Sequence, residues 1–150
     1  MPHNRKIILL VDDDAEFISE LQESLALSGY IPVTAVNGAE AIKLALKIKP
    51  DLVLLDLKLG KENGILVAEK IRKYPVTSRI PIIMISGYFN GREGLSLPTP
   101  SNVNIYLSKP FSQKDVVRSI QGVLEDDEEA SFDVVRYMVE KSRKKTETAY

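Results

Sequence analysis

The sequence predicts an α/β protein built on a parallel sheet, and two observations lead to this class. Short apolar runs that suit strands alternate along the chain with stretches of helical spacing. Polar residues follow these runs directly, as expected when parallel strands bring functional groups to one edge of a sheet. Because parallel strands need right-handed crossover helices, we expect helices on both faces of the sheet.

Five strands are expected, and their composition indicates where two of them lie. The run 52–56 is apolar without alternation, which is typical of a strand covered on both faces. Pro32 lies in the second run and cannot donate a ladder hydrogen bond, so this strand should be at an edge of the sheet. The expected strands span residues 6–11, 31–36, 52–56, 81–85 and 103–107.

Four helices fit between and after these strands, and local signals mark their ends. Gly29 suits the carboxyl end of the first helix, while Asn37 and Ser112 can cap the second and the fourth. Helical spacing predicts that Phe17, Leu21, Leu25 and Leu27 face inward in the first helix. The expected helices span residues 15–28, 38–48, 65–73 and 112–125.

The alternation breaks at residues 87–100, which contain three Gly and two Pro. A regular helix there would cost about 1 kcal/mol for each interior Gly and about 3 kcal/mol for each Pro. We therefore expect a loop with at most one or two helical turns.

The end of the chain has the pattern of a further helix. An acidic run at 125–129 precedes apolar residues at helical spacing, and basic residues at 141–145 follow them. Acids at the start and bases at the end complement the helix dipole. We expect a domain at 5–126 and a C-terminal helical extension at 127–150. Its apolar side, which either docks on this domain or binds a partner, consists of Phe132, Val135, Met138 and Val139.

Composition limits the classes of function. The 150 residues are 44% apolar, which suffices for one domain with a sizeable core. The net charge of −1 gives no global attraction to nucleic acid or membrane, and the absence of Cys excludes disulfides and thiolate metal sites. The first apolar run has five residues, too few for a signal peptide or a membrane span, so we expect a cytoplasmic protein.

The residues at the predicted strand ends form a chemical set. Asp12 and Asp13 follow the first strand, Asp56 ends the third, Ser86 follows the fourth and Lys109 follows the fifth. Carboxylate oxygens suit Mg²⁺, and a carboxylate beside Mg²⁺ can attack phosphorus to give an aspartyl phosphate. A hydroxyl and an ammonium can stabilise the phosphoryl oxygens. The set therefore predicts phosphoryl chemistry, whereas Asp14 is expected to cap a helix.

The sequence resembles the receiver domain of bacterial two-component response regulators, in particular the single-domain receivers of the chemotaxis type. The resemblance covers about residues 5–125. Its motifs are Val11-Asp12-Asp13, the run 51–56 ending in Asp56, Asn63-Gly64, Ile85-Ser86-Gly87 and the run 106–111 around Lys109-Pro110. It implies a flavodoxin-like, doubly wound, five-stranded parallel sheet in the order 2-1-3-4-5, with a degenerate fourth helix.

The resemblance also implies a metal site. Asp13 and Asp56 match direct ligands of Mg²⁺, the backbone carbonyl of Lys58 matches a third protein ligand, and Asp12 matches a residue that acts through water. Gly60 departs from the family, in which Pro is common at this place in the loop.

Further roles follow for the phosphoryl group and the switch. Asp56 matches the phosphoacceptor, Ser86 and Lys109 match the hydroxyl and the lysine that contact the phosphoryl group, and Tyr106 matches the aromatic residue that swings inward on phosphorylation. Ser86 replaces the commoner Thr with the same hydroxyl. The segment 87–100 stands where the family has its fourth helix, part of the face that reports phosphorylation, so the usual output surface is in doubt.

The expected function is that of a phosphoacceptor that catalyses only its own phosphorylation and dephosphorylation. The donor would be a phosphohistidine on a sensor kinase or a phosphotransfer protein, and the output would be contact with a downstream protein or relay of the phosphoryl group. A second copy of the chain is a further candidate partner, whereas direct binding to nucleic acid or to a membrane is not expected.

Two alternatives remain open on the sequence. Asp12-x-Asp14 loosely resembles the first motif of haloacid-dehalogenase-like phosphotransferases, but that function leaves Asp56 unexplained and requires another acidic pair after Lys109. A pseudo-receiver that acts only as an interaction module should have lost acidic or lysine positions, and none is lost here.

Overall fold

A computed structural model describes residues 5–86, 103, 105–108 and 112–125. Five parallel strands form one sheet, in the order β2-β1-β3-β6-β7. This is the predicted 2-1-3-4-5 order, and Pro32 lies in the edge strand as expected. The strands are β1 (Ile7–Val11), β2 (Ile31–Ala35), β3 (Leu52–Asp56), β6 (Ile82–Ser86) and β7 (Ile105–Ser108).

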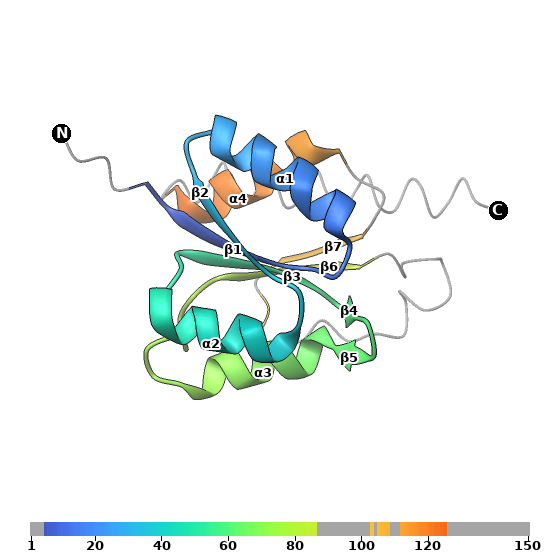
Figure 1. Ribbon diagram of the computed structural model, residues 1–150. Helices are drawn as coiled ribbons and strands as arrows, with labels where there is room; N and C mark the ends of the chain where they lie inside the picture. The colour runs from blue at the N-terminus through green and yellow to red at the C-terminus, as the bar shows by residue number, and fades with distance from the viewer. Residues whose placement is uncertain (1–4, 87–102, 104, 109–111, 126–150) are drawn as a thin grey trace.

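Helices cover both faces of the sheet (Figure 1). One layer contains α1 (Ala15–Leu27) and α4 (Gln113–Leu124), and the other contains α2 (Gly38–Ile48) and α3 (Gly64–Lys73). The α/β class is therefore confirmed, and the predicted element boundaries agree with the structure to within two residues. None of the helices in the described ranges is long and apolar enough to cross a membrane.

Side chains of successive strand residues point to opposite faces, so each buried strand contributes to two cores. In β1, Ile8 and Leu10 pack in the cluster under α1 and α4, while Leu9 and Val11 pack in the cluster over α2 and α3. Burial on both faces explains the apolar run of β3, all of whose residues are buried.

Side-chain caps fix the starts of the helices. Asn37 accepts a hydrogen bond from the Glu40 amide at 2.8 Å, and Ser112 forms a reciprocal capping box with Asp115. Asp14 caps α1 by accepting from the Phe17 amide at 3.1 Å. The predicted caps at these three positions are thereby confirmed.

The inward face of α1 differs from the prediction at one residue. Ile18, Leu21 and Leu25 are buried, whereas Leu27 is 82% exposed. Successive residues of a helix are turned by about 100°, so Leu27 lies nearly opposite Leu25. Its predicted inward position was wrong, because Leu25 and Leu27 cannot both face the core from one helix.

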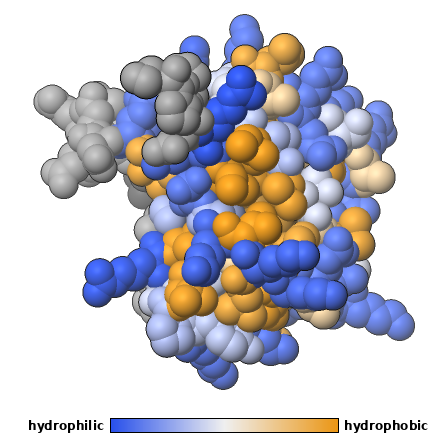
Figure 2. All heavy atoms as spheres, turned by 60° about the vertical axis from the view of Figure 1, so that its left-hand side comes forward, coloured by the Kyte–Doolittle hydropathy of each residue, from blue (hydrophilic) through white to orange (hydrophobic). Residues whose placement is uncertain are grey.

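An apolar patch lies at the end of the molecule that is on the left in Figure 1. Figure 2 shows this side, on which apolar side chains gather and charged side chains border them. Leu27 at the end of α1 and Ile31 at the start of β2 are exposed apolar residues on either side of the connection between these elements. The carboxyl ends of the strands point to the other end of the molecule (Figure 1), so this patch is separate from the predicted site.

The segments 87–100 and 127–150 lie outside the described residues. The predicted loop, the C-terminal helical extension and the domain boundary at 126 therefore stay predictions.

The two leucines near the end of α1 provide a test of this packing. Leu25→Ala should destabilise the protein by about 2–5 kcal/mol, because it leaves a cavity in the core. Leu27→Ala should change the free energy of unfolding by less than about 0.5 kcal/mol, because the side chain is exposed. Urea unfolding of both variants measures the difference, and equal losses would contradict the orientation of α1.

Candidate functional site

Three carboxylates converge at the carboxyl edge of the sheet. Asp12 and Asp13 follow β1 directly and Asp56 is the last residue of β3, its neighbour in the sheet. One carboxylate oxygen from each lies within 4.8 Å of the others. Asp12 and Asp56 are buried, while Asp13 is exposed to solvent. The structure thus brings together the three acidic residues that the sequence predicted.

Backbone amides fix the orientation of these carboxylates. Asp12 accepts a hydrogen bond from the Asp14 amide at 3.0 Å, and Asp56 accepts one from the Lys58 amide at 3.1 Å. Asp13 accepts one from the Gly60 amide at 2.8 Å. Amide donors stabilise the ionised form of a carboxylate. Each acidic side chain is therefore held by the loop that follows its own strand or a neighbouring one.

The cluster fits a hard divalent cation. Like charges at these distances repel one another, and the repulsion is stronger near a protein surface than in bulk water. Mg²⁺ takes oxygen ligands, uses one or two carboxylates and keeps several waters. One exposed and two buried carboxylates offer such a set, with solvent access at Asp13. The carbonyl of Lys58 stays a prediction as a ligand.

A two-stranded hairpin shapes the loop after Asp56. β4 (Lys58–Leu59) pairs antiparallel with β5 (Glu62–Asn63), where the sequence predicted only a loop. Gly60 turns the chain with a φ of 57°, a conformation that proline cannot adopt. Glu62 accepts a hydrogen bond from the Gly38 amide at 3.2 Å, which ties the hairpin to the start of α2. Strands of two residues give no periodic pattern from which they could be predicted.

Gly64 lies against the backbone of the candidate phosphoacceptor. A β-carbon at this position would lie 2.2 Å from the Asp56 carbonyl oxygen and 2.9 Å from the Leu57 Cα. The Gly64 amide donates to the Leu57 carbonyl at 2.6 Å, and Asn63 caps α3 by accepting from the Ile65 amide. The close approach explains the Asn63-Gly64 motif: the helix begins directly on the end of β3, the strand that carries Asp56.

The hydroxyl residue lies at the same edge of the sheet. Ser86 ends β6 and is 1% exposed. Asp56 pairs in register with Ile85, so Ser86 stands one residue beyond it on the adjacent strand, opposite Ser108 of β7. The structure places Tyr106 in β7 but describes only its backbone, and Lys109 lies outside the described residues. The contributions of these two side chains stay predictions.

The comparisons with known proteins agree with this geometry. The model of the response regulator receiver domain family matches residues 8–121. The chain belongs to this family. The Bacillus subtilis alkaline phosphatase synthesis transcriptional regulatory protein PhoP is 36% identical over 129 residues, which are 84% of this chain and 51% of that protein. The chain thus spans about half the length of the curated relatives that it matches.

Solved receiver structures share the fold of this receiver domain. A CheY-like receiver domain protein from Methanospirillum hungatei aligns with a TM-score of 0.73 and 26% identity, over 83% of this chain and 98% of that chain. The Thermotoga maritima response regulator TrrA, solved in complex with Mg²⁺-BeF, aligns with a TM-score of 0.68 and 33% identity, over 79% and 99% of the two chains.

The close packing at Gly64 predicts that an added methyl group destabilises the protein more at this position than at another glycine. Gly64→Ala should lower the melting temperature and displace the Asp56 loop, because the methyl group would meet backbone atoms that cannot rotate away. Gly38→Ala is the matched control at another helix start, since its methyl group would meet only the side chains of Glu62 and Val67. Thermal melts of both variants test this. A smaller loss for Gly64→Ala than for Gly38→Ala would contradict the packing described here.

The acidic cluster predicts that removal of one charge raises the stability of the metal-free protein and lowers the stabilisation by added Mg²⁺. Asp13→Asn keeps an oxygen for the Gly60 amide but removes one charge, so the metal-free protein should gain about 1 kcal/mol, or about 2–4 °C in melting temperature. Stabilisation by added Mg²⁺ should fall in the same variant. If Mg²⁺ titrations give equal dissociation constants for the variant and the wild type, Asp13 is not a ligand.

Proposed function

We propose that this receiver domain accepts a phosphoryl group on Asp56 from a phosphohistidine of a sensor kinase or a phosphotransfer protein, in a Mg²⁺-dependent reaction. The observation that carries the proposal is the convergence of three carboxylates, those of Asp12, Asp13 and Asp56. The buried Ser86 lies on the adjacent strand β6, one residue beyond the register partner of Asp56. In the proposed metal site, Asp13, Asp56 and the Lys58 carbonyl are direct ligands, and Asp12 acts through water.

The transfer is a displacement at phosphorus. An oxygen of the Asp56 carboxylate forms a bond to phosphorus while the bond from phosphorus to the donor imidazole nitrogen breaks, and the electron pair stays on that nitrogen. The Lys58 amide holds the carboxylate in one orientation, so little reorganisation is needed. Bound Mg²⁺ would neutralise charge on the phosphoryl oxygens.

Ser86 and Lys109 complete the site in this proposal. The Ser86 hydroxyl donates to one phosphoryl oxygen, and the Lys109 ammonium neutralises another. Tyr106 is the switch residue of this proposal: its side chain swings inward when Asp56 is phosphorylated. Burial of Ser86 supports its part, because a donor shielded from bulk water interacts more strongly with a charged group.

The output is proposed to be contact with a downstream protein or relay of the phosphoryl group, in the cytoplasm. PhoP of Bacillus subtilis is a transcriptional regulatory protein about twice as long as the matched region, so its whole activity is not assigned to this chain. Membership of the receiver family gives the haloacid-dehalogenase alternative no support, and Asp14 is engaged as the cap of α1.

Labelling with a small phosphodonor and Mg²⁺ tests the phosphoacceptor. Wild type should gain one acid-labile phosphoryl group, and Asp56→Asn should gain none, because an amide is a poor nucleophile. Asp14→Asn is the matched control, since Asn caps helices as well as Asp does and the residue lies next to the cluster. Intact-mass analysis reads the outcome. Undiminished labelling of Asp56→Asn would refute the assignment, and no labelling of wild type would indicate a pseudo-receiver.

The lifetime of the phosphoryl group is a separate expectation. Lys58 stands two residues after the phosphoacceptor and Tyr88 two residues after Ser86, and these positions flank the path of the hydrolytic water in receivers. Long or bulky side chains there should slow hydrolysis, which suits relay. The double variant Lys58→Ala, Tyr88→Ala should therefore lose its phosphoryl group faster than wild type. An unchanged or slower decay would contradict the expectation that these two side chains slow hydrolysis.

A further inference from the structure

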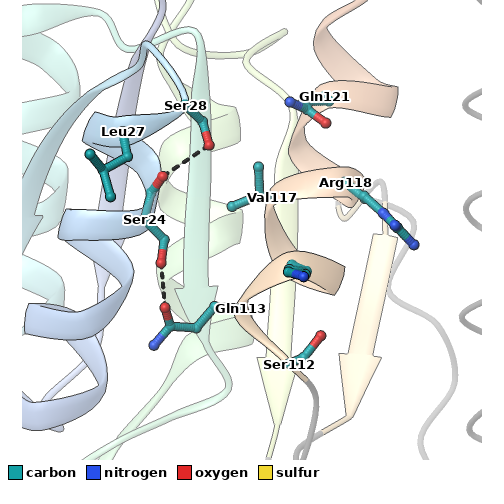
Figure 3. A pocket seen from close by; sticks show the side chains of 9 residues that line it. Ser24, Leu27, Ser28, Ser112, Gln113, Val117, Arg118 and Gln121 are labelled. Atoms are coloured by element: carbon teal, nitrogen blue, oxygen red, sulfur yellow. Dashed lines mark hydrogen bonds between the residues drawn. The ribbon is translucent and has the colours of Figure 1, made fainter.

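Two sides of α4 have partners in the described structure. Val116 and Ile120 belong to the core cluster between the sheet and the layer of α1 and α4. A groove of about 680 Å³ separates α4 from α1 (Figure 3), and Val117 and Gln121 point toward α1 across it. Gln113 spans this groove by hydrogen bonds to Ser24 and to Glu20.

A third side of α4 is also buried. Asp115 is 4% exposed, Ser119 is 1% exposed and Gly122 is buried as well. With about 100° between successive residues, these three lie on the side of the helix nearly opposite Val117. We call them the outer face of α4. A helix that packs on a sheet beside one neighbouring helix normally leaves such a side to solvent.

The outer face has the character of a contact surface. Ser and Gly keep it shallow, which allows another backbone to approach closely. Within the described part of the chain, the buried Ser119 hydroxyl has no hydrogen-bond partner. A buried hydroxyl without a partner is costly, so this face fits a covering segment that also offers a polar group.

The chain itself supplies a segment of matching spacing. α4 ends at Leu124, and the acidic run 125–129 follows before the apolar residues of the predicted extension begin. From the end of α4 backward, Gly122, Ser119 and Asp115 step by three and then four residues. Forward along the extension, Phe132, Val135 and Val139 also step by three and then four. Two antiparallel helices with these steps bring each pair to the same height.

Size and charge agree with the same pairing. Phe132 would meet Gly122, a large side chain against the smallest one, and the basic residues at 141–145 would follow near Asp115. The twelve residues of α4 span about 18 Å, and the residues from 130 onward are numerous enough to return along its whole length.

We propose that residues 130–143 form a helix that packs antiparallel on the outer face of α4 of the same chain, with Val135 against Ser119. The extension is then an intramolecular cover for α4. This inference does not depend on phosphorylation of Asp56.

Paired cysteines test the contact in the 150-residue chain, which has no cysteine of its own. After mild oxidation, Ser119→Cys with Val135→Cys should lose its free thiols and give a cross-linked monomer. Ser119→Cys with Tyr137→Cys is the matched control: Tyr137 is turned by about 200° from Val135 on the predicted helix, so this pair should keep its thiols. A cross-linked dimer in the first pair would assign the face to a second copy and overturn the proposal. Thiols that survive in both pairs would also overturn it.

Amide hydrogen exchange gives an independent measurement on single variants. Val135→Asp should speed exchange in residues 115–122 of α4, because a carboxylate cannot be buried against the outer face without a partner. Tyr137→Asp, on the opposite side of the predicted helix, should leave that exchange as in wild type. Equal exchange in the two variants would show that another segment covers α4, and the proposal would fail. Phosphodonor labelling of both variants should match wild type, which separates this outcome from failure of the proposed function.

Discussion

Three negative charges are held together at one edge of the sheet, and much of the surrounding structure serves to keep them there. The parallel register of β1, β3 and β6 brings Asp12, Asp56 and Ser86 to the same edge. Coulomb repulsion opposes this arrangement, and hydrogen bonds from backbone amides offset part of it. The apolar cores on both sides of the sheet stabilise the fold and offset the repulsion at the charged edge.

The position of Asp56 depends on backbone as well as on side chains. Its strand ends where α3 begins, and the absence of a side chain at Gly64 allows the helix to start directly on the strand. The backbone amide of Lys58, two residues later, donates a hydrogen bond to the Asp56 carboxylate. A carboxylate placed by main-chain atoms on two sides has a defined direction before any ligand arrives, which is what a nucleophile or a metal ligand requires.

Most of the fold and the acidic cluster could be predicted from sequence, because both follow from period and position. Apolar runs and caps such as Asn37 mark where elements begin, and residues that follow parallel strands must share an edge. Other features depend on tertiary contact. The hairpin at 58–63 is too short to show a pattern, and the amide partner of Asp13 belongs to a residue far along the chain. Leu27 was predicted to face inward, but it lies about 200° around the helix from the buried Leu25 and is exposed.

The turn at Gly60 links the hairpin to the acidic cluster. Gly60 has a positive φ, and its N–H group donates to Asp13. Proline could supply neither, because its ring fixes φ at about −65° and its nitrogen carries no hydrogen. Substitution of Gly60 by proline would therefore disrupt the turn of the hairpin and remove the hydrogen bond to Asp13 in one step. The geometry of the hairpin and the orientation of an acidic side chain are thus coupled through one residue.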